Sequence, residues 1–136
     1  MESASQAFNL PAHTREDIQV LAGLVLEDVG WRFGTLPTVT VSDRFTRYRL
    51  GTAWGLERRI NIYWKPMALW ASTAVEDVIR HELAHVLATQ RGYFGHHGEP
   101  WREACVELGA LPRADADQRM RLDYAATNSG EHRANE

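Results

Sequence analysis

Two histidines and a glutamate in the middle of the chain have the types and spacing of a metal-dependent hydrolytic site. They form the pattern His81-Glu82-Leu83-Ala84-His85. If this segment is helical, residues four apart lie on one face, so both imidazoles can bind one ion. Glu82 lies about 100° around the helix axis from His81, which lets its carboxylate hold a water molecule at the metal. The pattern predicts zinc as the metal and Glu82 as the general base.

The predicted surroundings of Glu82 favour this interpretation over a structural one. An unpaired carboxylate among large apolar residues loses on the order of several kcal/mol of solvation. On a helical wheel Glu82 falls in such a sector, whereas the wheel places small residues that leave room for an ion around the histidines. The alternative is a pair of core or surface histidines beside a glutamate buried against an arginine. The apolar sector contains Val75, Val78, Ile79 and Val86, and the small residues are Ala74, Ala84 and Ala88.

A catalytic zinc ion usually has three protein ligands, so a third ligand must come from outside the helix. The metzincin pattern is excluded because Ala88 and Arg91 stand where it requires glycine and histidine. The helix from His85 to Gly92 carries the chain ~10 Å away. The five residues from Gly92 to His97 can span ~17 Å. A loop after the helix can therefore return to the metal.

The downstream candidates for the third ligand are two adjacent histidines and three glutamates. Adjacent residues in an irregular loop usually point apart, so we expect one histidine to bind and the other to be a bystander or to line the cleft. A glutamate ligand, Glu103 or Glu107, is the gluzincin-like alternative. Tyr63, Tyr93 and His96 are candidates for supporting the oxyanion. The full set of candidate ligands is His96, His97, Glu99, Glu103 and Glu107.

The histidine pattern lies in the strongest predicted helix of the chain. Thr73 and Glu76 have the spacing of a capping box, and the segment continues without Gly or Pro to Gly92, a typical helix end. Upstream, Thr14 and Asp17 predict the start of an amphipathic helix over residues 15–30. Downstream, Pro100 suits the first turn of a short helix that ends at Gly109. Residues 113–120 are a further candidate helix.

Between the first two helices the pattern changes to that of a small sheet. Apolar and polar residues alternate over residues 38–42, and two further segments around residues 48–54 and 60–64 are rich in aromatic and β-branched residues. We expect two or three short strands, with Gly51 and Gly55 at turns or bulges. The chain is therefore predicted to contain an N-terminal helix, a small sheet, the helix with the histidine pattern and a short C-terminal helix.

Composition and length predict one cytoplasmic domain over residues 1–136, with a core at about 15–110 and a polar tail at about 128–136. The N-terminal segment lacks a signal-peptide core and no stretch is long and apolar enough for a membrane span. A single cysteine, Cys105, excludes an intrachain disulfide and zinc sites built on several cysteines. The net charge of −3 gives no global case for nucleic-acid binding.

The chain resembles the SprT-like zinc metallopeptidases, which include the Spartan proteases. The resemblance is carried by the histidine helix and by His97-Gly98-Glu99-Pro100-Trp101, which is similar to the family's His-Gly-Pro-Glu-aromatic element with Pro and Glu exchanged. It covers about residues 15–110, and its specific part is residues 81–101. Upstream, residues 51–53 and 60–62 look like the family's small sheet.

The resemblance implies a third zinc ligand at His97 and endopeptidase activity on protein substrates. It also implies an α+β fold, in which the N-terminal helix and the small two- to three-stranded sheet pack on the active-site helix and a short C-terminal helix follows. Some family members cleave proteins crosslinked to DNA, and some bacterial members carry a cysteine-rich zinc module. With one cysteine this chain lacks that module, which weakens the expectation of a DNA-linked role.

Between Arg44 and Lys65, basic and aromatic residues interleave as on surfaces that stack bases. This stretch makes single-stranded DNA a candidate partner. We favour the simpler interpretation, in which strand alternation puts the aromatic residues in the core and the arginines in water. The competing function is a non-proteolytic nucleic-acid-binding module with a structural, four-ligand zinc site. The stretch contains Arg44, Arg47, Arg49, Arg58, Arg59 and Lys65 together with Phe45, Tyr48, Trp54, Tyr63 and Trp64.

Overall fold

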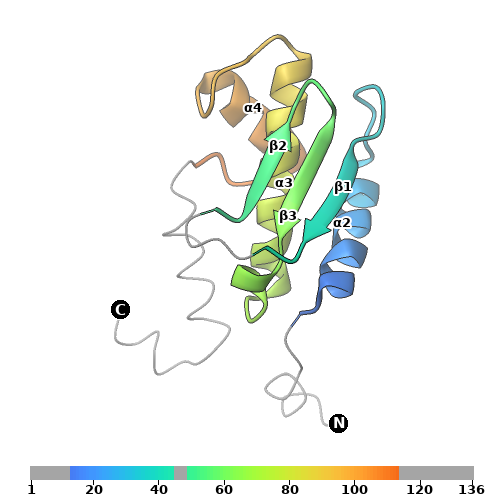
Figure 1. Ribbon diagram of the computed structural model, residues 1–136. Helices are drawn as coiled ribbons and strands as arrows, with labels where there is room; N and C mark the ends of the chain where they lie inside the picture. The colour runs from blue at the N-terminus through green and yellow to red at the C-terminus, as the bar shows by residue number, and fades with distance from the viewer. Residues whose placement is uncertain (1–12, 45–48, 114–136) are drawn as a thin grey trace, which may run out of the picture.

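The computed structural model describes residues 13–44 and 49–113, which form an α+β fold. Figure 1 shows a three-stranded sheet with helices α2 and α3 side by side on one face and α4 near the C-terminal end of α3. The predicted fold class is confirmed. The elements are α2 (Arg15–Val29), β1 (Thr38–Ser42), β2 (Gly51–Trp54), β3 (Arg59–Tyr63), the short 3-10 helix η1 (Lys65–Met67), α3 (Ser72–Gln90) and α4 (Glu99–Leu108).

Helix α2 has the boundaries that its capping residues predict. The Thr14 hydroxyl accepts a hydrogen bond from the Asp17 amide, and the Asp17 carboxylate accepts one from the Thr14 amide. At the other end Gly30 adopts a left-handed conformation with φ of 58°, which costs glycine little. Ile18, Ala22 and Val25 are buried, so one face of α2 packs into the core.

The sheet has the order β1-β3-β2, with β3 in the centre. Strand β3 pairs in parallel with β1 and antiparallel with β2. Ile60 and Ile62 are fully buried, whereas Arg59 before them and Asn61 between them are partly exposed. This alternation turns one face of β3 toward the helices. Strand β2 is left at the edge, where it contacts α3.

Helix α3 starts earlier than the predicted capping box. Its N-cap is Ala71, which makes no side-chain cap, and the Ala71 carbonyl accepts the first helical hydrogen bonds from Ala74 and Val75. Thr73 therefore lies within the first turn, and its predicted capping role is wrong. The helix ends at Gln90, and Gly92 follows with φ of 94°, near the predicted stop.

Helix α4 follows the sequence signals closely. Pro100 lies in the first turn, where a missing N–H group costs no hydrogen bond. Gly109 ends the helix with φ of 81°. Trp101, Ala104, Cys105 and Leu108 form its buried face and join one hydrophobic cluster with α2, β3 and α3. The predicted helix over residues 113–120, apart from Arg113, and the tail at 128–136 lie outside the described residues.

No helix in the described parts of the chain combines the length and the apolar character that crossing a membrane requires.

Candidate metal centre and cleft

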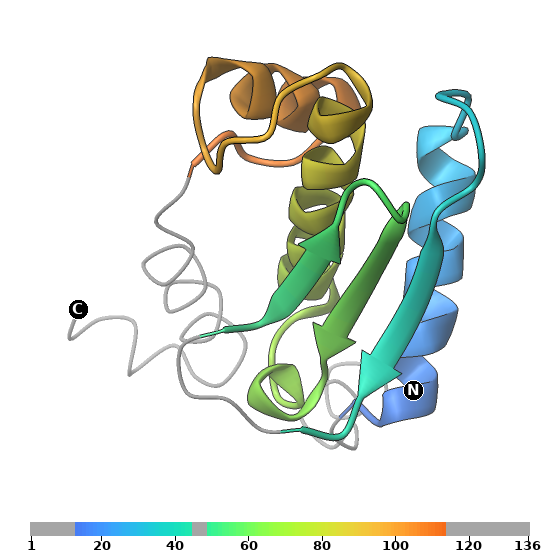
Figure 2. The same cartoon turned by 45° about the horizontal axis from the view of Figure 1, so that its top comes forward.

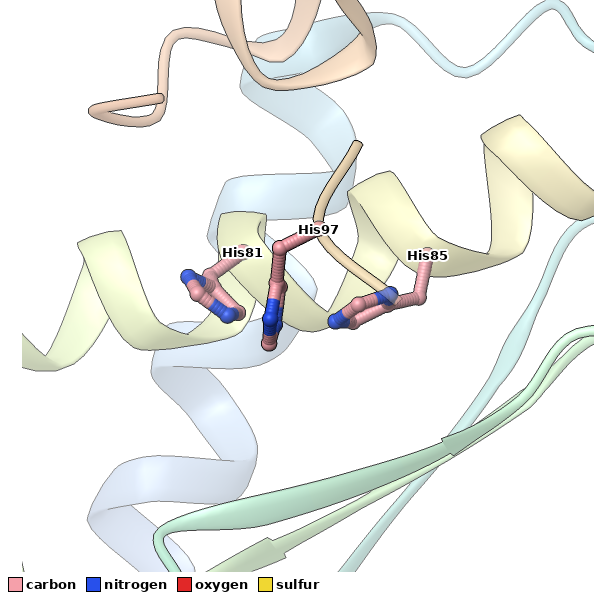
Figure 3. Close-up of side chains that lie close together, drawn as sticks. All are labelled: His81, His85 and His97. Atoms are coloured by element: carbon pink, nitrogen blue, oxygen red, sulfur yellow. The ribbon is translucent and has the colours of Figure 1, made fainter. Parts of the chain in front are cut away.

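Helix α3 carries His81 and His85 on one face, one turn apart. His81 is buried and His85 is half-buried. Figure 3 shows both rings projecting from the same side of α3, with the ring of His97 descending between them from the loop after the helix. The imidazole centroids of His81 and His85 are 5.5 Å apart. The helix thus fixes two of the three nitrogen donors, as the four-residue spacing predicts.

The loop between α3 and α4 returns His97 to this face, and Tyr93 holds it there. The Tyr93 amide donates to the Ala88 carbonyl, and its hydroxyl accepts a 2.8 Å hydrogen bond from the Gly98 amide. A Cβ atom at Gly98 would overlap that hydroxyl, so the close approach needs glycine. On the other side of the loop, Arg102 donates to the His97 carbonyl at 2.8 Å.

The three histidines could bind one metal ion. One ring nitrogen from each of His81, His85 and His97 lies within 4.8 Å of the others. Zinc bonds to imidazole are about 2.0–2.1 Å long, so a tetrahedral ion holds its nitrogens about 3.3 Å apart. Among the described residues no fourth His, Cys, Asp or Glu joins the group, a donor set that suits a site with one open position.

Trp101 forms the floor under all three histidines. Its ring lies 4.7 Å from that of His81, 4.6 Å from that of His97 and 5.4 Å from that of His85, measured between centroids. The Trp101 side chain is completely buried, and its indole N–H points at the His81 carbonyl at 3.4 Å. A large rigid ring in this position restricts the rotamers of the donors and keeps water from their apolar side.

The environment of His85 and His97 favours their uncharged form at neutral pH. Burial lowers the pKa of His85 to about 4, with smaller contributions from His97 and His96. Burial also lowers the pKa of His97, and the neighbouring His96 adds to the effect. Neutral imidazole is the form that binds a metal ion. Protons therefore compete weakly for these nitrogens near pH 7.

Glu82 is buried beside the histidines, as the helical wheel predicts. Its side chain packs against β2, where a Cβ atom at Gly51 would lie 3.0 Å from the Glu82 Cγ. Burial raises the pKa of Glu82 to about 7, while the positive charge of Arg49 acts in the opposite direction. A carboxyl group with a pKa near the working pH can both accept and return a proton.

A cleft of about 670 Å³ joins these groups to the edge of the sheet. One wall is β2 with its following turn, and the other is the loop from Phe94 to His97, while α3 supplies the base. Figure 2 shows β2 alongside α3, with the loop to α4 above its end. His81, Glu82, His85 and His97 all line this cleft. The donors and the carboxylate therefore face one common space.

The remaining ligand candidates do not enter the three-histidine group. His96 lines the cleft, and its ring centroid is 6.4 Å from that of His97. Glu103 is exposed on α4. Glu107 forms an ion pair with Arg91 and Glu99 one with Arg102. Of the downstream candidates, the structure brings His97 to the helix pair.

Two of the three residues considered for oxyanion support have other partners. The Tyr63 hydroxyl bonds to the Thr52 hydroxyl at 2.9 Å, and the residue is only 5% exposed. The Tyr93 hydroxyl is used by Gly98. His96 stays in the cleft. Arg49, which sequence reasoning considered only with the basic stretch, also lines the cleft. Its position follows from strand pairing, so no local sequence pattern could have located it.

The basic and aromatic stretch divides between core and surface. Tyr63 is buried, and the guanidinium carbon of Arg59 lies 3.8 Å from the ring centre of the half-buried Trp54. The Trp64 indole donates to Asp43 at 2.8 Å. Arg44 and Arg58 are exposed. The expectations for Phe45, Arg47 and Tyr48 lie outside the described residues.

Comparison of the chain with protein-family models, with curated proteins and with solved structures found no match. The family resemblance thus depends on the motif residues themselves.

Proposed function

We propose that this protein is a zinc-dependent endopeptidase of the SprT-like kind. The observation that carries the proposal is the convergence of three imidazoles and one buried carboxyl group on a single cleft. His81, His85 and His97 would hold the ion, and their nitrogen donors suit zinc. A bound zinc ion would polarise a water molecule and the carbonyl of a peptide bond.

Glu82 supplies the acid–base chemistry in this proposal. Its carboxylate accepts a proton from the attacking water and then delivers that proton to the amine that leaves. Its pKa of about 7 supports both steps, because the group can exchange a proton in either direction near neutral pH. The buried setting also strengthens the electrostatic interactions of the carboxylate with the reacting groups.

Strand β2 provides a reason to propose a polypeptide substrate. It pairs with β3 on one side and is the last strand of the described sheet on the other. Residues 51–54 line the cleft that contains the three histidines. Unpaired strand edges bind extended peptides through main-chain hydrogen bonds. A peptide added to this edge would pass directly beside Glu82.

A cleavage assay with an unstructured protein such as β-casein tests the proposal. Purified protein with one equivalent of zinc is compared with the same protein after chelation, with and without single-stranded DNA, and with a His81→Ala/His85→Ala variant. We expect fragments in the zinc-loaded sample, their loss on chelation and their return with added zinc. If the protein binds zinc but cleaves nothing, either with or without single-stranded DNA, the proposal is contradicted. Cleavage that requires DNA would make the basic stretch part of the function.

A further inference from the structure

We propose that one end of the cleft is an apolar subsite that binds a large hydrophobic side chain of the substrate. The subsite consists of Leu56, at the tip of the β2–β3 hairpin, and Phe94, in the loop that carries His97. It rests on the proposed function, since its occupant is a residue of the peptide that enters the cleft. It would make the enzyme selective for unfolded segments that contain exposed hydrophobic residues.

The exposure of these two side chains sets them apart. Leu56 is 77% exposed and Phe94 is 69% exposed, the highest values among the large hydrophobic residues of the described chain. Both line the cleft that contains the histidines. The other exposed hydrophobic residues lie outside this cleft. An exposed apolar pair inside a functional cleft is typical of a binding site.

The hairpin tip is held firmly, so the exposure of Leu56 is built into the fold. The Glu57 amide donates to the Trp54 carbonyl and the Arg58 amide to the Gly55 carbonyl, both at 3.1 Å. Gly55 lies so close to Thr89 of α3 that a Cβ atom there would overlap the threonine side chain. The turn is therefore docked on the active-site helix and presents Leu56 at its tip.

The backbone next to Phe94 is also held by hydrogen bonds. Tyr93 bonds to the backbone of Ala88 and Gly98, and Phe94 follows it directly. His97 follows Phe94 by three positions, which limits the distance between their Cα atoms to about 10 Å. The apolar residue is thus tied to the loop that carries the third histidine.

The apolar end lies to one side of the catalytic groups. Gly51 packs on Glu82 and Gly55 packs on Thr89, so β2 runs along α3 from the carboxylate toward the hairpin tip. Five residues from Gly51 to Leu56 span at most about 17 Å. A substrate extended along this edge would place its hydrophobic residue within about five positions of the cleaved bond, on one side only. The charged Arg49, two residues before the opposite end of the strand, also lines the cleft.

Among the described residues, no unpaired acidic group at the proposed subsite would favour a basic side chain of the substrate over an apolar one. Glu57 is the charged residue of the hairpin tip that lines the cleft, and its carboxylate is paired with Arg59 at 2.9 Å. Gly55, Gly95 and the half-buried Trp54 and Thr89 also line the cleft. The lining therefore offers contact area to an aromatic or aliphatic side chain and no unpaired acid to a basic one.

The test measures binding and cleavage separately. Two fluorescein-labelled peptides of Ser, Thr, Ala and Gln are used, identical except that one contains a single central Phe. Affinity is measured by fluorescence anisotropy with zinc-loaded Glu82→Gln protein, which needs no turnover. We expect the Phe peptide to bind roughly 10- to 100-fold more tightly. Adding Leu56→Ala and Phe94→Ala should remove the difference, whereas adding Leu36→Ala and Leu69→Ala, exposed leucines outside the cleft, should preserve it.

Equal affinity for the two peptides, or a difference that survives the Leu56→Ala/Phe94→Ala change, would overturn the subsite. Zinc binding and thermal unfolding of each variant show that the fold is intact. Mass spectrometry of peptides cut by the wild-type protein separates the two proposals. Preferential binding without any cleavage would reject the protease and keep the subsite. Cleavage that ignores the position of Phe would keep the protease and reject the subsite.

Discussion

Arg80 and His81 are neighbours on α3, yet they belong to two polar clusters of different character. Arg80 donates to Asp28 of α2 at 2.7 Å and to the Leu108 carbonyl of α4 at 2.8 Å, so its charge joins three helices. His81, His85 and His97 instead direct donor atoms at one another. Hydrogen-bond donors that are matched to acceptors, like those of Arg80, stabilise a fold. Several metal-ligating nitrogens that converge on one point are instead suited to bind an ion from solution.

The largest expected effect concerns the third donor. His97→Ala should weaken zinc binding by roughly a hundredfold or more, because loss of a direct ligand exceeds the 10- to 100-fold typical of outer-shell changes. His96→Ala, which removes the adjacent imidazole of the same loop, should change affinity only a few-fold. Competition with a chromophoric chelator measures both. A Glu103→Ala variant as weak as His97→Ala would show that the ligand set is wrong.

The buried carboxyl group should have a signature in the pH dependence of stability. The pKa of Glu82 is raised from 4.5 to about 7 in the folded chain, so the folded state binds the proton more tightly than the unfolded state. Its ionisation therefore costs stability as pH rises from about 4.5 to 7. In metal-free protein, Glu82→Gln should gain stability relative to wild type over that range, on the order of 3 kcal/mol at most. Urea unfolding at pH 4, 6 and 8 measures this, and a constant difference would contradict it.

Substitution of Arg80 should lower stability and leave zinc binding unchanged, in contrast to substitution of His97. Arg80→Met leaves the Leu108 carbonyl without its charged donor and is expected to lower the free energy of unfolding by about 1–3 kcal/mol. Zinc affinity should stay unchanged, since Arg80 contributes nothing to the three-histidine group. Arg15→Met, which removes the exposed ion pairs of Arg15 with Glu16 and Asp43, is the matched control and should cost less than about 0.5 kcal/mol. Loss of zinc binding in Arg80→Met would erase the distinction between the two clusters.

The smallest effect tests how the loop is held. Tyr93→Phe removes the hydroxyl that accepts from Gly98 and should weaken zinc binding by up to about tenfold, because the loop no longer holds His97 in place. Tyr63→Phe also deletes one hydroxyl near the sheet, the one bonded to Thr52. It should leave zinc affinity unchanged. Equal zinc affinities of the two variants would show that the Tyr93 hydroxyl does not support the metal centre.

Local signals predicted the helices well, because capping and left-handed glycines depend on few residues. Thr14, Gly30 and Gly109 lie at the helix boundaries that their types indicate. The exception is Thr73, whose capping spacing with Glu76 is overridden because the chain already turns into the helix at Ala71. A capping-box spacing shows that a helix can start at that position, whereas the backbone conformation of the preceding residues determines where the helix does start.

The pairing of strands distant in the sequence could not be predicted from local sequence patterns. Alternation predicted the strands, but the order β1-β3-β2 depends on contacts between distant residues. That order puts Arg49 and Leu56 in the cleft with the histidines. The helical spacing of His81 and His85, by contrast, predicted their shared face directly. The three-histidine group was therefore foreseeable from spacing and loop length, and the walls of its cleft were not.

In the proposed enzyme the three histidines and Glu82 form one hydrolytic centre. The most direct test measures zinc content and peptide cleavage in the same preparations of wild-type and Glu82→Gln protein. We expect one zinc ion per chain in both and a loss of cleavage of at least about a hundredfold in the variant. Full activity in zinc-loaded Glu82→Gln protein would contradict the account.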